Sequence, residues 1–113
     1  MVLTVWERVT LLLSLPAEGD LLSLRIVRRL REALSFAEDE QALFKFEQSG
    51  EQTRWRGDVP QEADIPIGAK ATEIVRRQLK ELVDQLDKQG KLTEMYLGMC
   101  AKFGLTFDEP LEE

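Results

Sequence analysis

The stretch FKFEQSGEQTRWR, residues 44–56, decides the fold class of this chain. Its apolar and polar residues alternate with a period of two, and Ser49-Gly50 at its centre is typical of a turn. We expect a β-hairpin in which Phe44 faces Trp55 and Phe46 faces Thr53. Because the segments on both sides have a helical period, this hairpin makes the chain α+β rather than all-helical.

Two helices are expected before the hairpin. Thr4 and Glu7 have the spacing of a capping box, which predicts a first helix that Pro16 ends. Asp20 is a good N-cap residue for a second helix over residues 21–34. A short acidic helical turn over residues 36–42, after a capping-box spacing of Ser35 with Glu38, leads into the hairpin.

Two more helices are expected after the hairpin. The clearest apolar stripe of the chain runs over residues 69–89 and is followed by Gly90, a residue typical of helix C-caps. A last helix is expected over residues 94–103. Between hairpin and helices, residues 64–67 are expected to add an edge strand, because Pro66 cannot donate a ladder hydrogen bond. The predicted order is therefore helix-helix-β-β-(β)-helix-helix, with four main helices around a small antiparallel meander.

Length and composition indicate one domain. A chain of 113 residues is long enough for one hydrophobic core, and no internal repeat is visible. We expect residues 1–104 to form a single α+β domain and residues 105–113, LTFDEPLEE, to form an acidic flexible C-terminal tail.

The residue inventory argues against catalysis. The chain has no histidine and one cysteine, Cys100, so it lacks the commonest general base and has no cysteine pair for an internal disulfide. Its acidic clusters have neither the spacing nor the glycine of a known cation loop, and familiar nucleotide-binding and hydrolase motifs are absent. We therefore expect no enzyme activity, no metal and no cofactor.

The opening residues 1–16, MVLTVWERVTLLLSLP, resemble a signal peptide only superficially. No basic residue precedes the apolar part, Glu7 and Arg8 interrupt it, and it is too short to span a bilayer. The expectation is a cytoplasmic protein without a membrane partner, and a single cysteine fits a reducing compartment.

Arginine is concentrated in RIVRRLR, residues 25–31, although the chain has 15 basic and 21 acidic residues and a net charge of −6. Three interpretations stay open: a solvated helix face, an ion-pair network, or an anion site for phosphate or a nucleotide. In the third, Arg25, Arg28 and Arg29 line a pocket, joined by Arg54 and Arg56. The net negative charge and the lack of interleaved exposed aromatic residues argue against nucleic acid.

Two aromatic features also invite interpretation. Trp55, between Arg54 and Arg56, is either the core anchor of the hairpin or a contact point for a partner, since Trp and Arg are enriched in such places. In the first helix, one apolar face is expected, formed by Val5, Trp6, Val9, Leu12 and Leu13. Leu11 and Leu15 lie elsewhere on the helical wheel. This excess predicts a homo-oligomer whose interface contains Trp6, Leu11 and Leu15.

Two stretches are familiar in combination, LPAEGDLLSLRIVRRLREALSFAEDE at residues 15–40 and IGAKATEIVRRQLKELVDQLDKQGKLTEMYLGMCAKF at residues 67–103. With the hairpin between them, they resemble small accessory proteins of tailed bacteriophages and prophages. The resemblance implies a phage-derived setting, in the host cytoplasm, and a non-enzymatic role. It brings no functional residues with it.

Taken together, these observations predict a non-enzymatic module that binds and regulates another protein, for example by inhibiting a host defence protein. Two alternatives come from other classes. One is a small-anion or nucleotide-binding protein that uses the arginines of residues 25–31. The other is a structural or assembly protein that forms oligomers through its first helix.

Overall fold

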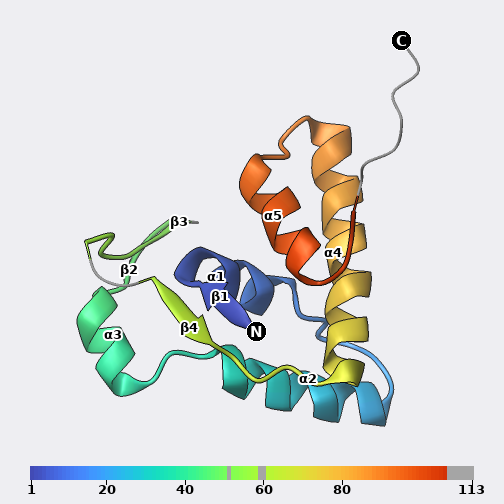
Figure 1. The fold of residues 1–113 in the computed structure, drawn as a ribbon, viewed down its shortest axis with the longest axis horizontal. Helices are drawn as coiled ribbons and strands as arrows, with labels where there is room; N and C mark the ends of the chain where they lie inside the picture. Colours follow the sequence, from blue (N-terminus) through green and yellow to red (C-terminus); the bar gives the residue numbers. More distant parts are fainter. Residues whose placement is uncertain (51, 59–60, 107–113) are drawn as a thin grey trace.

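A computed structural model describes residues 1–50, 52–58 and 61–106 of the chain. Within these residues it contains five helices and two small antiparallel sheets, which confirms the α+β class (Figure 1). The helices are α1 Val5–Ser14, α2 Leu21–Leu34, α3 Glu38–Phe44, α4 Ala69–Gln89 and α5 Glu94–Lys102. The strands are β1 Val2–Thr4, β2 Glu47–Ser49, β3 Gln52–Arg54 and β4 Glu62–Asp64.

The helix starts follow local hydrogen bonding. Thr4 and Glu7 form the predicted capping box of α1: Glu7 N donates to Thr4 Oγ1 over 3.1 Å, and Thr4 N donates to Glu7 Oε1 over 2.9 Å. The side chain of Asp20 caps α2 by accepting from Ser23 N over 2.7 Å. These two predicted caps are therefore confirmed, whereas the predicted capping box of Ser35 with Glu38 is wrong, because the N-cap of α3 is Ala37 and Ala37 N donates to Glu40 Oε1.

Helix α4 has the predicted bounds, and Gly90 ends it in the left-handed conformation with φ of 65°. Ile74, Val75, Leu79 and Val83 are its buried side chains. They pack against α1, α2 and α5, which lie around α4 in Figure 1. The longest helix of the described chain is thus the common support of the other three.

Helix α1 buries a different face from the predicted one. Leu11 and Leu15 are 2% and 9% exposed and belong to the core, whereas Leu13 is 82% exposed. Leu11 and Leu15 are thus not available at an oligomer interface of this fold. Arg8 lies on this same buried face of α1 and donates hydrogen bonds to Leu34, Ser35 and Glu40.

The two sheets are separate, not one meander. Strand β1, which the sequence pattern did not predict, pairs with β4 so that Leu3 faces Ala63. Ile65 N also donates to Met1 O over 2.8 Å. The third strand therefore lies at residues 62–64 instead of 64–67, and it joins the N-terminal strand rather than the hairpin.

The hairpin is present with a different register. Glu47 faces Arg54 and Ser49 faces Gln52, so Phe44 does not face Trp55. The predicted register was wrong because α3 extends to Phe44, and Lys45 ends that helix in the left-handed conformation with φ of 50°. Phe44 is therefore a helical residue, and its carbonyl accepts from Arg56 N over 2.8 Å.

The predicted C-terminal tail begins inside the fold. Leu105 is 5% exposed and packs in the core, and its backbone N–H donates to Cys100 O over 3.0 Å. Residues 107–113, the rest of the predicted tail, lie outside the described residues.

Candidate functional site

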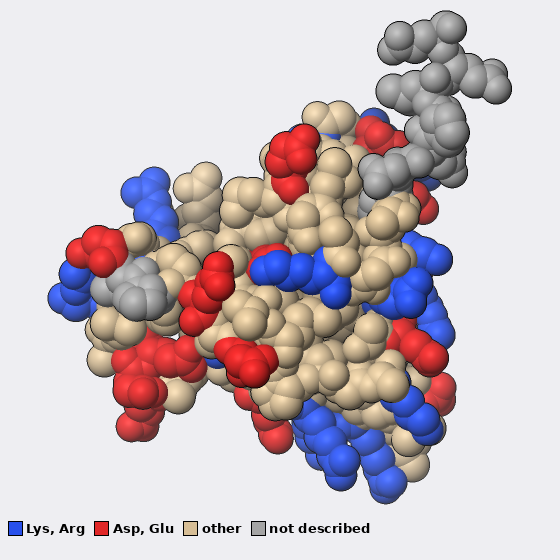
Figure 2. Space-filling model, viewed as in Figure 1, with Lys and Arg blue, Asp and Glu red and all other residues tan. Residues whose placement is uncertain are grey.

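The basic face of α2 is fully presented to solvent. Arg25, Arg28, Arg29 and Arg31 are all exposed, and in the part of the chain that the structure describes none of their guanidinium groups makes a hydrogen bond or an ion pair. Figure 2 shows basic side chains gathered along the edge where Figure 1 places α2. An ion-pair network within the molecule, one of the three interpretations, is therefore not formed among the described residues.

Exposed leucines lie in the first turn of α2, directly before the arginines. Leu21, Leu22 and Leu24 are 69%, 57% and 36% exposed. We call the exposed leucines and arginines of this helix the α2 surface; it consists of Leu21, Leu22, Leu24, Arg25, Arg28, Arg29 and Arg31. Apolar side chains at residues 21–24 and cationic side chains at residues 25–31 thus share a surface that no described part of the chain covers.

A groove of about 550 Å³ borders the α2 surface where α2 meets the start of α4. We call it the α2–α4 groove. Two cationic residues, Arg29 and Lys70, line it, together with the backbone of Gly68. Its apolar lining consists of Leu22, Ile26, Leu30, Pro66, Ala69 and Ala71. The first turn of α4, at its edge, contains no acidic residue and has no side-chain cap.

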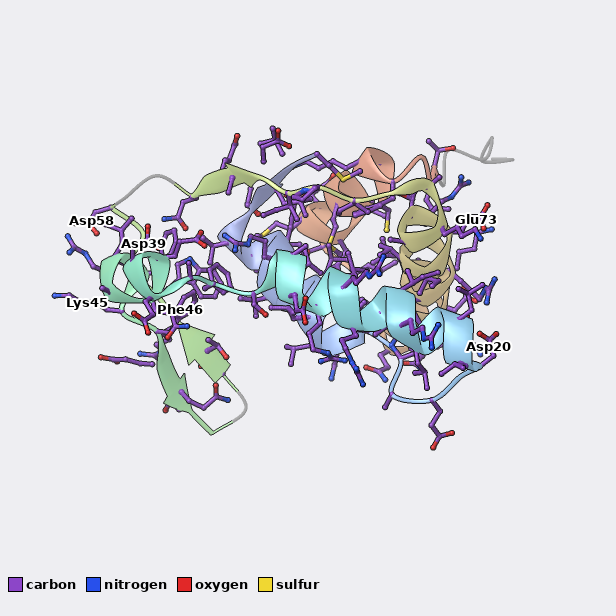
Figure 3. All side chains as sticks on the ribbon, turned by 90° about the horizontal axis from the view of Figure 1, so that it is seen from below. Asp20, Asp39, Lys45, Phe46, Asp58 and Glu73 are labelled. Carbon is purple, nitrogen blue, oxygen red and sulfur yellow. The ribbon has the colours of Figure 1, made fainter. Side chains whose placement is uncertain are left out.

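The second predicted group lies elsewhere. Arg54, Trp55 and Arg56 line a smaller hollow of about 250 Å³ with Lys45 and Glu47. Figures 1 and 3 place this hairpin at the opposite end of the molecule from Asp20 and the start of α2. The structure therefore does not bring Arg54 and Arg56 together with the arginines of α2 in one anion pocket.

Within this second group, the side chains of Arg56 and Trp55 already have partners. Arg56 forms an ion pair with Asp58, with Nη2 2.6 Å from Oδ2, and Asp58 raises the pKa of that guanidinium. The half-buried Trp55 donates from Nε1 to Gln61 Oε1 over 2.9 Å. Its ring lies 6.2 Å from that of Phe46, so Trp55 lies at the edge of an aromatic cluster whose other members are Phe36, Phe44 and Phe46.

Arg8 is a buried charged residue that the sequence pattern did not identify. Its side chain is 2% exposed. Nε donates to Leu34 O over 3.1 Å, and Nη2 donates to Ser35 O over 2.8 Å. Nη1 forms an ion pair with Glu40 Oε2 over 2.6 Å, and the guanidinium carbon lies 3.9 Å from the centre of the Phe36 ring. Arg8 therefore joins α1 to the end of α2 and to α3.

The environment of Glu40 follows from this contact. Hydrogen bonding from Arg8, and to a smaller extent from the backbone of Ala37, lowers the pKa of the Glu40 carboxyl, while partial burial opposes this shift. Because each of the three guanidinium nitrogens of Arg8 donates to an oxygen atom of the protein, this side chain has a structural rather than a ligand-binding environment.

A second buried charge connects α1 with α5. Glu7 is 5% exposed, and its Oε1 lies 2.6 Å from Lys102 Nζ. Lys102 also donates to the carbonyl of Val2 over 3.1 Å.

Trp6, beside Glu7 in α1, is half-buried, with its ring 4.9 Å from that of Tyr96. Of the three residues predicted for the oligomer interface, Trp6 is the one that is partly exposed. It lies next to Met95, which is 53% exposed.

The remaining candidate chemistry is limited. Burial raises the pKa of the Cys100 thiol, which is 0% exposed and packed in the core. In residues 1–50, 52–58 and 61–106, no three Cys, Asp or Glu side chains lie close enough together to hold a metal ion.

Comparison of the chain with known protein families, curated proteins and solved structures finds no match. The resemblance to phage accessory proteins stays a prediction. Among the described helices, none combines the length and the apolar character that crossing a membrane requires.

Proposed function

We propose that this chain is a non-enzymatic protein-binding module and that its binding site is the α2 surface. The observation that carries the proposal is the free cationic and apolar chemistry of one helix face. The α2 arginines have no ion partner among the described residues, and the leucines that precede them in the first turn of the helix are exposed. Arginine is one of the residues that most often contribute binding energy in protein interfaces, and exposed apolar side chains beside it add area that binding can bury.

The proposal also accounts for the cost of this surface. A lone exposed leucine needs no explanation, but several on one helix turn form an apolar patch that usually marks an interaction site. Arginines beside it keep the free protein soluble and add specificity, because a guanidinium group forms two parallel hydrogen bonds with a carboxylate.

If the resemblance to phage accessory proteins holds, the partner is a host protein in the cytoplasm, and binding inhibits it. The lone buried Cys100 fits such a reducing compartment. Under this proposal, inhibition needs no chemistry from the small protein, since occupying the partner's surface is sufficient.

The test compares two variants with the same change in charge. Arg25→Glu/Arg28→Glu/Arg29→Glu reverses the α2 surface, and Arg76→Glu/Lys80→Glu/Lys88→Glu reverses three exposed cations of α4. Partners captured from a lysate of the source organism by wild type are identified, purified and titrated by calorimetry against all three proteins. We expect the α2 variant to lose at least about tenfold in affinity and the α4 variant to bind like wild type. No stoichiometric partner, or equal binding by both variants, contradicts the proposal.

A second candidate function is the binding of a small anion, favoured by Arg29 and Lys70 at one groove. A thermal-shift screen of nucleotides and inorganic phosphate separates it from protein binding. A ligand that raises the melting temperature of wild type but not of Arg29→Ala supports the anion function, and a flat screen removes it.

Assembly through α1 is the third candidate, favoured by the 82% exposure of Leu13. Light scattering at high protein concentration tests it. A defined oligomer that Leu13→Asp converts to monomer supports assembly, and a monomeric wild type removes it.

A further inference from the structure

We infer that the α2–α4 groove receives a large apolar side chain from an acidic segment of the partner protein, whose carboxylates pair with Arg25, Arg29 and Lys70. This inference rests on the proposed function, because it names the chemistry of the segment that the α2 surface binds. The groove and the charges beside it are the observations that support it.

The groove has the size and lining of an apolar binding site. Its volume of about 550 Å³ falls within the range of roughly 300–1,000 Å³ that is typical of ligand pockets. The floor is contributed by Leu30, which is 3% exposed and belongs to the core, and by the half-buried Ile26. An apolar side chain placed here would bury against side chains that are already fixed by core packing, so it would lose little to rearrangement.

The electrostatic surroundings of the groove favour negative charge. Arg29 and Lys70 line it from two different helices, and Arg25 lies one turn before Arg29 on the same exposed side. The first turn of α4 adds the partial positive charge of a helix N-terminus, with no acidic residue or side-chain cap to offset it. No acidic side chain lines this groove among the described residues. A carboxylate-bearing partner therefore fits, and a basic partner does not.

The extent of the surface favours a protein segment over a small molecule. The exposed side chains of the α2 surface continue from the groove along the helix, with Leu21 and Leu24 in its first turn and Arg31 in its last. The 14 residues of α2 span about 21 Å, at about 1.5 Å per residue. An amphipathic segment with alternating apolar and acidic side chains can contact this whole length, in the manner of a helix or strand laid on a groove.

Ala69 offers a variant that tests the groove without harming the fold. It is exposed, lines the groove and occupies the first position of α4. A glutamate there complements the helix dipole, so Ala69→Glu should keep or slightly raise the stability of the protein. The matched control is Gln85→Glu, which adds the same charge at an exposed site of the same helix, about 24 Å farther along its axis.

The experiment uses synthetic peptides and the full chain. The probe is a fluorescein-labelled peptide of about twelve residues in which glutamates alternate with leucine and phenylalanine. One control peptide has serine at the apolar positions, and another has lysine in place of glutamate. A fourth peptide, FDEPLEE, has the sequence of residues 107–113 of the chain itself. Binding is measured by fluorescence anisotropy, and circular dichroism verifies the fold of each variant.

We expect the acidic apolar peptide to bind wild type and Gln85→Glu equally, and Ala69→Glu at least about tenfold more weakly. The serine and lysine peptides should bind much more weakly than the acidic apolar peptide. Equal binding of the serine peptide, or no effect of Ala69→Glu, overturns the inference. So does binding of FDEPLEE alone, because the occupant would then be this chain's own segment. Self-association through the same surface, seen by sedimentation and abolished by Ala69→Glu, overturns it in favour of a second copy.

The two proposals fail separately. If the peptides do not bind, but a purified partner still requires Arg25, Arg28 and Arg29, the protein-binding function stands and only the inferred chemistry of the partner is wrong. If the acidic apolar peptide binds at Ala69 and no natural partner depends on the arginines, the inferred ligand chemistry of the groove is supported. The proposed function of the α2 surface as the natural docking site is then wrong.

Discussion

Arg8 and Glu40 form a two-handed ion pair between α1 and α3, with Nη1 2.6 Å from Oε2 and Nη2 3.2 Å from Oε1. Figure 3 shows α3 and the hairpin extending away from the packed helices, with Asp39, Lys45 and Asp58 at that end. The contacts of Arg8 with Glu40, Ser35 and Phe36 hold this projecting part against the core. One buried side chain thus links α3 to α1 and to the end of α2.

The first prediction concerns Arg8 itself. Arg8→Ala leaves the carbonyls of Leu34 and Ser35 and the carboxylate of Glu40 without their partner. We expect a loss of about 3 kcal/mol in the free energy of unfolding, at the lower end for a broken buried ion pair because Glu40 is 28% exposed. Urea denaturation followed by circular dichroism measures it. Arg8→Lys should recover only part of the loss, since an ammonium group cannot form the paired contact.

The control for this prediction is the exposed pair of Arg56 with Asp58. Arg56→Ala should leave the urea midpoint unchanged, because both side chains of this pair are largely in solvent. Equal destabilisation by the two variants would show that the burial of Arg8 is not what stabilises the protein.

The second prediction is a pH dependence. The pKa of Glu40 is lowered from its ordinary value of 4.5, mainly by the hydrogen bond from Arg8. A lowered pKa in the folded state adds stability above the pKa of the unfolded chain, and this stability is lost as the pH falls through the lower folded value. The difference in unfolding free energy between wild type and Glu40→Gln should therefore be constant near neutral pH and shrink below about pH 4.5. A difference that stays constant down to about pH 3 argues against the ion pair.

The third prediction separates two leucines of α1. Leu11 is 2% exposed in the core, and Leu13 is 82% exposed. We expect Leu11→Ala to lower the free energy of unfolding by about 3 kcal/mol, as is typical when a buried leucine leaves a cavity. Leu13→Ala should have almost no effect on a monomer. If Leu13→Ala destabilised the protein more than Leu11→Ala, the buried face of α1 would be the one that sequence periodicity predicted.

The fourth prediction concerns Cys100. Its thiol is fully buried, and burial raises its pKa, so little thiolate forms at neutral pH and none of it is accessible. A thiol-reactive dye should label the native protein very slowly and label it fully once urea has unfolded the chain. Rapid labelling of the native protein would show that α5 separates from the core.

Local sequence determined those features of the fold that depend on near neighbours. The bounds of α4, the caps at Thr4 and Asp20, and the left-handed Gly90 all follow from contacts within a few residues. The change of period at residues 44–56 likewise predicts a hairpin, and the arginines of α2 are exposed as their place opposite the apolar arc indicates. Periodicity and capping carry this information because hydrogen bonds and helix faces repeat over short distances.

Only the tertiary structure decided which face of α1 packs inside, how the hairpin strands are aligned and where the N-terminal strand pairs. Leu3 lies opposite Ala63, and Arg8 finds Glu40, although each pair is far apart in the chain. Such partners leave no periodic trace, since a buried charge is tolerated only where distant groups happen to complete its hydrogen bonds. For the same reason the α2–α4 groove, formed where two separate helices meet, could not be read from either helix alone.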